Sequence, residues 1–134
     1  MDVQLNITML YAGLLAVLFI IWSLNVVRLR VQDQVGLGSG KSLRLAAAIR
    51  IQGNFVEYVP LALLLLALME WHGAPAPLLH SLGVVLLVGR IIHGIGLMQS
   101  AGKSAGRMLG TLATFAVLLL QAGYAIGAYC GAIL

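Results

Sequence analysis

Residues 43–71 read LRLAAAIRIQGNFVEYVPLALLLLALMEW, a stretch that is apolar except for a charged residue near each end, Arg44 and Glu70, and a short polar segment between residues 50 and 58. A helix of this length spans about 43 Å, which exceeds the hydrocarbon core of a bilayer at about 30 Å. The apolar residues are continuous rather than alternating, and the stretch is about twice as long as a membrane barrel strand. It therefore predicts a transmembrane helix.

Three further apolar stretches, residues 5–27, 77–98 and 107–133, reach or exceed the roughly 20 residues that a helix needs to cross a bilayer. Of the 134 residues 61% are hydrophobic and 9% are charged, against about 25% charged in soluble domains. This composition excludes a water-soluble enzyme and a disordered chain, and the single Cys130 excludes a disulfide scaffold. We predict one domain, residues 1–134, folded as an all-α, up-down bundle of four transmembrane helices.

The net charge of +4 is explained by membrane topology. Basic residues flank the first and third connections, and the other connection and both termini have none; they are Arg28, Arg30, Lys41, Arg44, Lys103 and Arg107. By the positive-inside rule, these two connections are cytoplasmic and both termini lie on the opposite side. The first helix lacks the basic start of a signal peptide and is expected to remain in the mature protein. No basic surface with groove-reading or aromatic partners is visible, so no nucleic-acid partner is expected.

The polar segment of residues 43–71 places Arg50, Asn54 and Glu57 at positions i, i+4 and i+7, which share one face of a helix. Gln52 points about 200° away from Arg50 and is expected to address a different neighbour. Tyr58 follows Glu57 in the sequence and can belong either to the face of Arg50 or to the side of Gln52. One helix face is therefore polar inside the membrane.

Arg90 lies about 20 Å along the third stretch, at a depth similar to that of Glu57 on the second. Isolated charges at this depth would each cost several kcal/mol. We therefore expect Glu57 and Arg90 to form an ion pair or to share one hydrogen-bond network.

Two interpretations of these charges stay open on the residues alone. They can fix the register of packed helices, or they can form a site, which is the usual role of ionisable groups at membrane depth. As a site, Arg50 with Arg28, Arg30 and Arg107 forms a basic collar near the cytoplasmic interface, suited to a small zwitterionic, net-anionic ligand. A lipophilic partner could reach it from the bilayer. A small multidrug transporter is a further alternative, which Arg50 and Arg90 disfavour because a cation site would avoid them.

The segment Arg50-Ile-Gln-Gly-Asn-Phe-Val-Glu-Tyr-Val-Pro60 resembles the signature of the MAPEG family, the membrane-associated proteins of eicosanoid and glutathione metabolism. Gly89-Arg90-Ile-Ile-His93 and Arg107-Met-Leu-Gly110 are similar to the region of its third and fourth helices. The short connections resemble the small bacterial branch. The resemblance implies a homotrimer in a bacterial inner membrane. It also implies glutathione bound between subunits near the cytoplasmic face, and a lipophilic electrophile or lipid arriving from the membrane lipids.

The resemblance also assigns residues to roles. Arg50, Asn54, Glu57 and Tyr58 correspond to glutathione ligands of one subunit, and Gln52 with Arg28 or Arg30 to those of its neighbour; Arg90 and His93 join the candidate binding residues. Arg107 corresponds to an arginine that stabilises the thiolate. Such help is needed because a thiol with a pKa of about 8.5 is mostly protonated at neutral pH. His93 and Leu97 stand where the mammalian transferases have tyrosines, so His93 either hydrogen-bonds in their place or is an interior histidine.

The function implied is a glutathione transferase or peroxidase acting on lipophilic electrophiles, and the alternative is a lipid-binding or scaffold protein of the same fold without catalysis. No metal is expected, because His72, His80 and His93 lack the spacing of metal ligands. Glycines recur every four residues at 102, 106 and 110 and at 123, 127 and 131. They predict close helix packing, either within the subunit or with the next.

Overall fold

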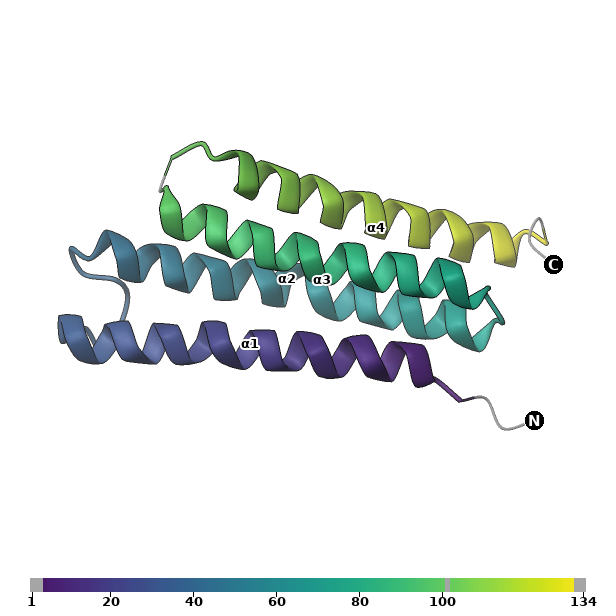
Figure 1. Ribbon diagram of the computed structural model, residues 1–134, viewed down its shortest axis with the longest axis horizontal. Coiled ribbons are helices and arrows are strands. Elements are labelled where there is room, and N and C mark those ends of the chain that lie inside the picture. Colours follow the sequence, from purple (N-terminus) through teal and green to yellow (C-terminus); the bar gives the residue numbers. More distant parts are fainter. Residues whose placement is uncertain (1–3, 101, 132–134) are drawn as a thin grey trace.

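The computed structural model describes residues 4–100 and 102–131. Within these residues the chain forms four helices: α1 (Asn6–Asp33), α2 (Leu43–Trp71), α3 (Ala76–Gln99) and α4 (Ala105–Tyr129). Each is long and apolar enough to cross a membrane. The helices run up and down, so the α1–α2 and α3–α4 connections lie at one end and the α2–α3 connection at the other (Figure 1). The predicted all-α fold with four membrane-spanning helices is confirmed for this part of the chain.

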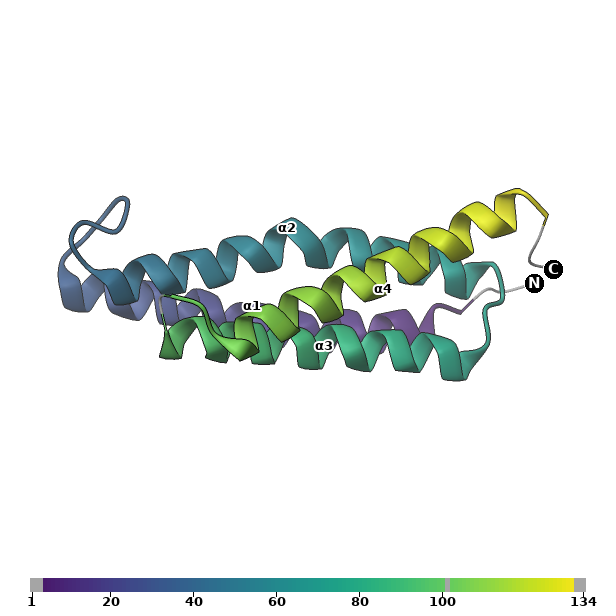
Figure 2. The ribbon, with the colours of Figure 1, turned by 90° about the horizontal axis from the view of Figure 1, so that it is seen from above.

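The helix α4 is added to one side of the bundle that α1, α2 and α3 form. It packs along α3, crosses toward the far end of α2 (Figure 2), and makes no contact with α1 within the described residues. Large apolar side chains point outward on the outer helices, among them Val17, Leu24 and Leu119. Such a surface is suited to lipid rather than to water.

Two helix ends differ from the sequence prediction by more than two residues, and the other ends agree within two. The helix α1 continues beyond residue 27 to Asp33, because Val26 and Leu29 are buried against Leu45 at the start of α2. It stops at Gln34, which has the left-handed φ of 53°. The helix α4 ends at Tyr129, ahead of Gly131 with φ +71°. The predicted end of this helix at residue 133 lies outside the described residues.

A carboxylate ties α1 to α2 at the end of the bundle that holds the α2–α3 connection. Glu70 Oε1 accepts a hydrogen bond from the backbone N–H of Ile7 at 2.8 Å, and Oε2 accepts one from that of Thr8 at 2.7 Å. The first N–H groups of a helix have no partner within it and carry partial positive charge. Glu70 therefore caps α1 from the neighbouring helix.

Glycines bring α3 and α4 into backbone contact. A Cβ atom at Gly110 would lie 2.4 Å from the carbonyl oxygen of Gly89, and one at Gly96 would lie 2.5 Å from the backbone nitrogen of Arg107. Gly123, by contrast, has open space where its Cβ would be. The glycines at the start of α4 thus pack within the subunit, and Gly123 does not.

Replacing Gly110 by Ala should destabilise the fold, because the added methyl group meets backbone atoms that cannot move aside. We expect a loss of about 1–3 kcal/mol for Gly110→Ala, and a gain of up to about 1 kcal/mol for the matched Gly123→Ala. Thermal denaturation in detergent, followed by circular dichroism, measures both. Equal shifts in the two variants would contradict the assigned packing.

Candidate functional site

The polar face of α2 divides into an exposed and a buried part. Arg50 and Glu57 are half exposed, at 53% and 48% of their side-chain area, and they form a bidentate ion pair. Arg50 Nη1 donates to Glu57 Oε1 at 2.9 Å and Nη2 donates to Oε2 at 3.1 Å. Asn54, between them in sequence, is turned into the bundle and is 9% exposed. The ion pair therefore forms the open rim of the site and Asn54 its inner wall.

Arg90 is the charged side chain at the centre of the bundle, with an exposure of 2%. Its guanidinium donates to Asn54 Oδ1 on α2 and, at 3.0 Å, to the carbonyl oxygen of Gly110 on α4. It also lies 6.0 Å from the centroid of the Tyr58 ring. One buried side chain thus joins α2, α3 and α4.

The prediction that Glu57 and Arg90 form an ion pair or share one hydrogen-bond network is wrong in both forms for the described residues. Glu57 pairs with Arg50 on its own helix, and Arg90 binds Asn54, which lies about one helical turn before Glu57. The sequence places Arg90 and Glu57 at a similar depth in the membrane, and the contact of Arg90 with Asn54 is close to that depth. Depth alone does not tell how α2 is rotated about its own axis. That rotation turns Asn54 inward and leaves Glu57 at the surface, where a guanidinium of the same helix satisfies it.

Positive charge converges on this region from three helices. His93 is 4% exposed and packs its Cβ atom close to Gly110, whose carbonyl oxygen binds Arg90. Arg50 on α2 and Arg107 on α4 lie about one helical turn from Asn54 and Gly110, the two residues that Arg90 binds. The three guanidiniums and the Glu57 carboxylate carry a formal net charge of +2. Such a cluster favours an anionic ligand that also has a positive group for Glu57.

Tyr58 and Arg107 extend the cluster toward α4. Tyr58 is half buried, and its ring contacts that of Phe115 on α4 with centroids 5.5 Å apart. Arg107 is exposed in the first turn of α4, where its backbone N–H is capped by Ser104 Oγ at 3.1 Å. Its side chain lines an open groove with Met108. The guanidinium of Arg107 is therefore accessible both to a ligand and to the apolar surroundings.

Gln52, Arg28 and Arg30 lie on the other side of the subunit, where α1 packs on α2. Gln52 Nε2 donates to Ser23 Oγ of α1 at 2.8 Å. Arg30 holds the α1–α2 connection through carbonyl oxygens, the shortest bond being 2.8 Å to Gly38, whereas the exposed Arg28 bonds Asn25 Oδ1 at 2.8 Å. Within one chain, these three residues therefore lie apart from the cluster of Arg50, Glu57, Arg90 and Arg107.

Two groups in these networks were not foreseen from the sequence. The Ser23 hydroxyl could have been noticed as an isolated polar group on an apolar helix. The Gly110 carbonyl carries no signal of its own, because every residue has one.

A sequence profile of the MAPEG family matches residues 8–127. The chain belongs to the MAPEG family. It is also similar to the inner membrane protein YecN of Escherichia coli, in strain K12 and in strain O6:H1. Each alignment is 43% identical over 115 residues, which is 86% of this chain and 86% of the relative. The match to MAPEG covers the whole polar cluster, from Arg50 on α2 to Arg107 on α4.

The buried hydrogen bond between Arg90 and Asn54 should contribute to the free energy of unfolding. Asn54→Leu leaves a buried guanidinium short of an acceptor, and Arg90→Met leaves a buried amide unsatisfied, so each change should cost about 3 kcal/mol. The double variant should cost clearly less than the sum, because both polar partners are gone. Arg50→Ala, which breaks an exposed pair, should cost at most about 1 kcal/mol.

Thermal denaturation of the four variants in the same detergent measures these differences. Additive losses for Asn54→Leu and Arg90→Met would show that the two side chains do not depend on each other.

Proposed function

We propose that this MAPEG protein is a membrane-bound glutathione transferase, or peroxidase, that acts on lipophilic electrophiles. The observation that carries the proposal is that Arg50 and Glu57 on α2 and Arg107 on α4 each lie about one helical turn from Asn54 or Gly110, the two residues that the buried Arg90 binds. Glutathione has two carboxylates and one ammonium group, and its thiolate form has a net charge of −2. The cluster offers the complementary charge, and Glu57 offers a partner for the ammonium.

Each side chain of the cluster has a distinct role in this proposal. Arg50 and Glu57, exposed and already paired, exchange part of their mutual contact for a carboxylate and an ammonium of glutathione. Arg90 donates a hydrogen bond to Asn54, and together the two side chains form the inner wall against which the ligand lies. Arg107 stabilises the thiolate, since no hydrogen bond engages its guanidinium among the described residues and a cation nearby favours the anionic form of a thiol.

The reaction needs little further chemistry from the protein. In a transfer, the thiolate forms a bond to an electrophilic carbon, and the electron pair of the broken bond leaves with the departing group or is protonated from water. In a peroxide reduction, the thiolate attacks a peroxide oxygen, the O–O bond breaks, the alcohol leaves after taking a proton from water, and the glutathione sulfur becomes a sulfenic acid. A second glutathione thiolate then attacks that sulfur, which forms the disulfide and releases the hydroxyl group as water. The apolar wall at Met108 gives a lipophilic electrophile access to Arg107 from the bilayer.

The proposal includes the homotrimer that the MAPEG resemblance implies, and the parts of the site that a single chain leaves apart support an assembly of several copies. The Arg50–Glu57 pair lies half exposed on a membrane-spanning helix, where charges need a protein or ligand cover. Gln52 and Arg28 face away from the cluster, so they reach a shared site only from a neighbouring subunit. Arg30 is engaged by its own connection, so we assign the neighbour's arginine to Arg28.

We propose that the site faces the cytoplasmic side of a bacterial inner membrane. The basic residues lie at the α1–α2 and α3–α4 connections, which share one end of the bundle (Figure 1), and positive charge marks the cytoplasmic side. The Escherichia coli relatives are named as inner membrane proteins.

A second candidate is a MAPEG protein that binds its ligands without turnover. His93 and Leu97 are both buried, so α3 presents neither a hydroxyl group nor an exposed imidazole to the site. This candidate predicts glutathione binding with no conjugate and no disulfide formed.

Glutathione binding to the detergent-purified protein tests the site. Arg50→Ala and Glu57→Ala should each weaken binding at least about tenfold, because each removes one charge-assisted contact of about 1.5–3 kcal/mol. Arg44→Ala is the matched control, since Arg44 is an exposed arginine on the same helix that pairs with Asp33. Isothermal titration calorimetry gives the affinities. Unchanged binding in Arg50→Ala and Glu57→Ala would contradict the proposed site.

Arg107→Ala tests catalysis. We expect kcat/KM for conjugation of a model electrophile to fall on the order of 100-fold, with little change in glutathione affinity. Bound glutathione should ionise at higher pH than in the wild type, because the cation that favours the thiolate is gone. Thiolate absorbance across a pH series measures this shift. Equal losses in binding and turnover would argue against thiolate stabilisation by Arg107.

A further inference from the structure

A cavity lies at the end of the bundle opposite the arginine cluster, between the last turns of α2 and α4. Its volume is about 440 Å³, which is within the range of sites for small molecules. It shares no lining residue with the cluster described above. Nothing in the proposed glutathione chemistry uses it.

The cavity lies where α4 crosses the last turns of α2 and places small side chains there. Ala125 and Ala128 form the α4 wall, where larger side chains would fill the space. On the opposite side, Met69 is 2% exposed and forms the buried floor. The small side chains of α4 leave this space empty, and the buried Met69 of α2 closes its inner end.

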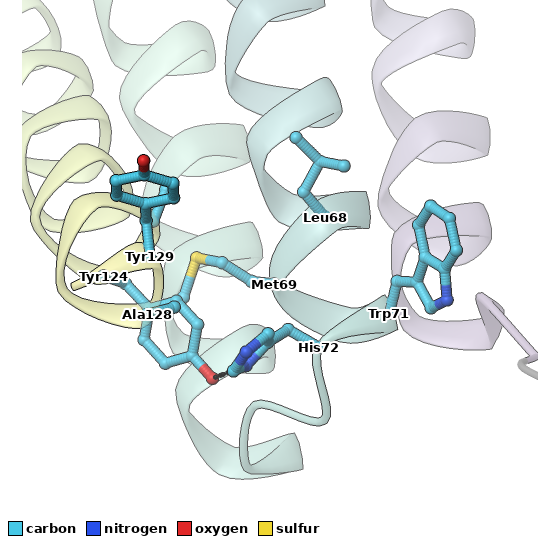
Figure 3. Close-up of a pocket in the computed structure, with 8 residues that line it drawn as sticks. Leu68, Met69, Trp71, His72, Tyr124, Ala128 and Tyr129 are labelled. Atoms are coloured by element: carbon cyan, nitrogen blue, oxygen red, sulfur yellow. Dashed lines mark hydrogen bonds between the residues drawn. The ribbon is translucent and has the colours of Figure 1, made fainter. Parts of the chain in front are cut away.

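The lining is aromatic and carries no acid, lysine or arginine among the described residues. Trp71, His72, Tyr124 and Tyr129 contribute rings. The Met69 sulfur lies between Tyr129 and the pair formed by His72 and Tyr124 (Figure 3). Aromatic rings and thioethers pack well against flat rings. The lack of fixed charge disfavours an anionic head group, which no side chain here would neutralise.

Two polar side chains of this lining, His72 and Tyr124, lie side by side. His72 Nδ1 and the Tyr124 hydroxyl lie 3.4 Å apart, at the long limit of a hydrogen bond, with their rings almost perpendicular at 85°. A contact this long leaves the phenol free to turn and donate to an acceptor on a ligand. A simple acyl chain would make no use of the pair.

We propose that this cavity binds an uncharged, membrane-dissolved molecule whose planar ring carries carbonyl groups, the chemistry of a quinone. The ring packs against Met69 and the tyrosines, and a carbonyl oxygen accepts the hydrogen bond of Tyr124. Trp71 is 66% exposed and Tyr129 is 93% exposed, so the rim opens toward the surroundings at the level where aromatic residues meet the membrane surface. The ligand enters from the bilayer.

The test uses duroquinone, a ring with two carbonyls and no tail, added to the full-length detergent-purified protein. Quenching of Trp71 fluorescence reports binding, with Trp71→Phe as the blank. We expect saturable quenching that Ala125→Leu weakens at least tenfold. Ala116→Leu, the same change at an exposed position of α4 outside the cavity, should leave the affinity within twofold. Durene, the same methylated ring without carbonyls, should compete at least tenfold less well.

Tyr124→Phe keeps the packing and removes the donor, so it should weaken duroquinone several-fold while leaving the weaker affinity for durene unchanged. Arg50→Ala should change neither affinity, which separates this proposal from the glutathione site. Equal quenching in Ala125→Leu and Ala116→Leu would overturn the proposal, as would durene binding as tightly as duroquinone. It would also be overturned if Ala125→Leu altered the oligomeric mass and not the quinone affinity, because a second copy would then occupy the cavity.

Discussion

A guanidinium inside a bilayer has no water to bond, so Arg90 must find its acceptors within the protein. It takes one from the side chain of Asn54 on α2 and one from the backbone of Gly110 on α4. The second acceptor is within reach because Gly89 and Gly110 have no side chains to hold α3 and α4 apart. The register of three helices is therefore set around a single buried charge.

The register of the three helices also determines where Arg50, Glu57 and Arg107 lie. With Asn54 turned inward to Arg90, the two charged residues that flank it on the same helix face, Arg50 and Glu57, are left at the surface. The close approach of α4 to α3 brings Arg107 to the same end of the bundle, where its guanidinium is exposed. Buried charge thus serves the architecture, and exposed charge is left for a ligand.

The sequence predicted the four helices well because span length and continuous apolarity are properties of each segment alone. It placed the end of α1 too early, since the burial of Val26 and Leu29 depends on Leu45 across the connection. The polar face of α2 was recognised from its spacing, but spacing does not tell which member of a face points inward. For that reason the sequence predicts Glu57 as the partner of Arg90, directly or through a shared network, whereas Arg90 binds Asn54. The assignment of Gln52 and Arg28 to a neighbouring subunit stays a prediction, because it concerns contacts between chains.

The pairing of Arg50 with Glu57 on a single helix bears on how the protein is made. A lone charge near the middle of a helix raises the free energy of insertion by about 2.5–3.5 kcal/mol. Because α2 carries its own counter-ion two turns away, the two side chains can offset each other while the helix is still alone. A newly synthesised chain can therefore insert α2 into the membrane without a counter-ion from another helix or another chain.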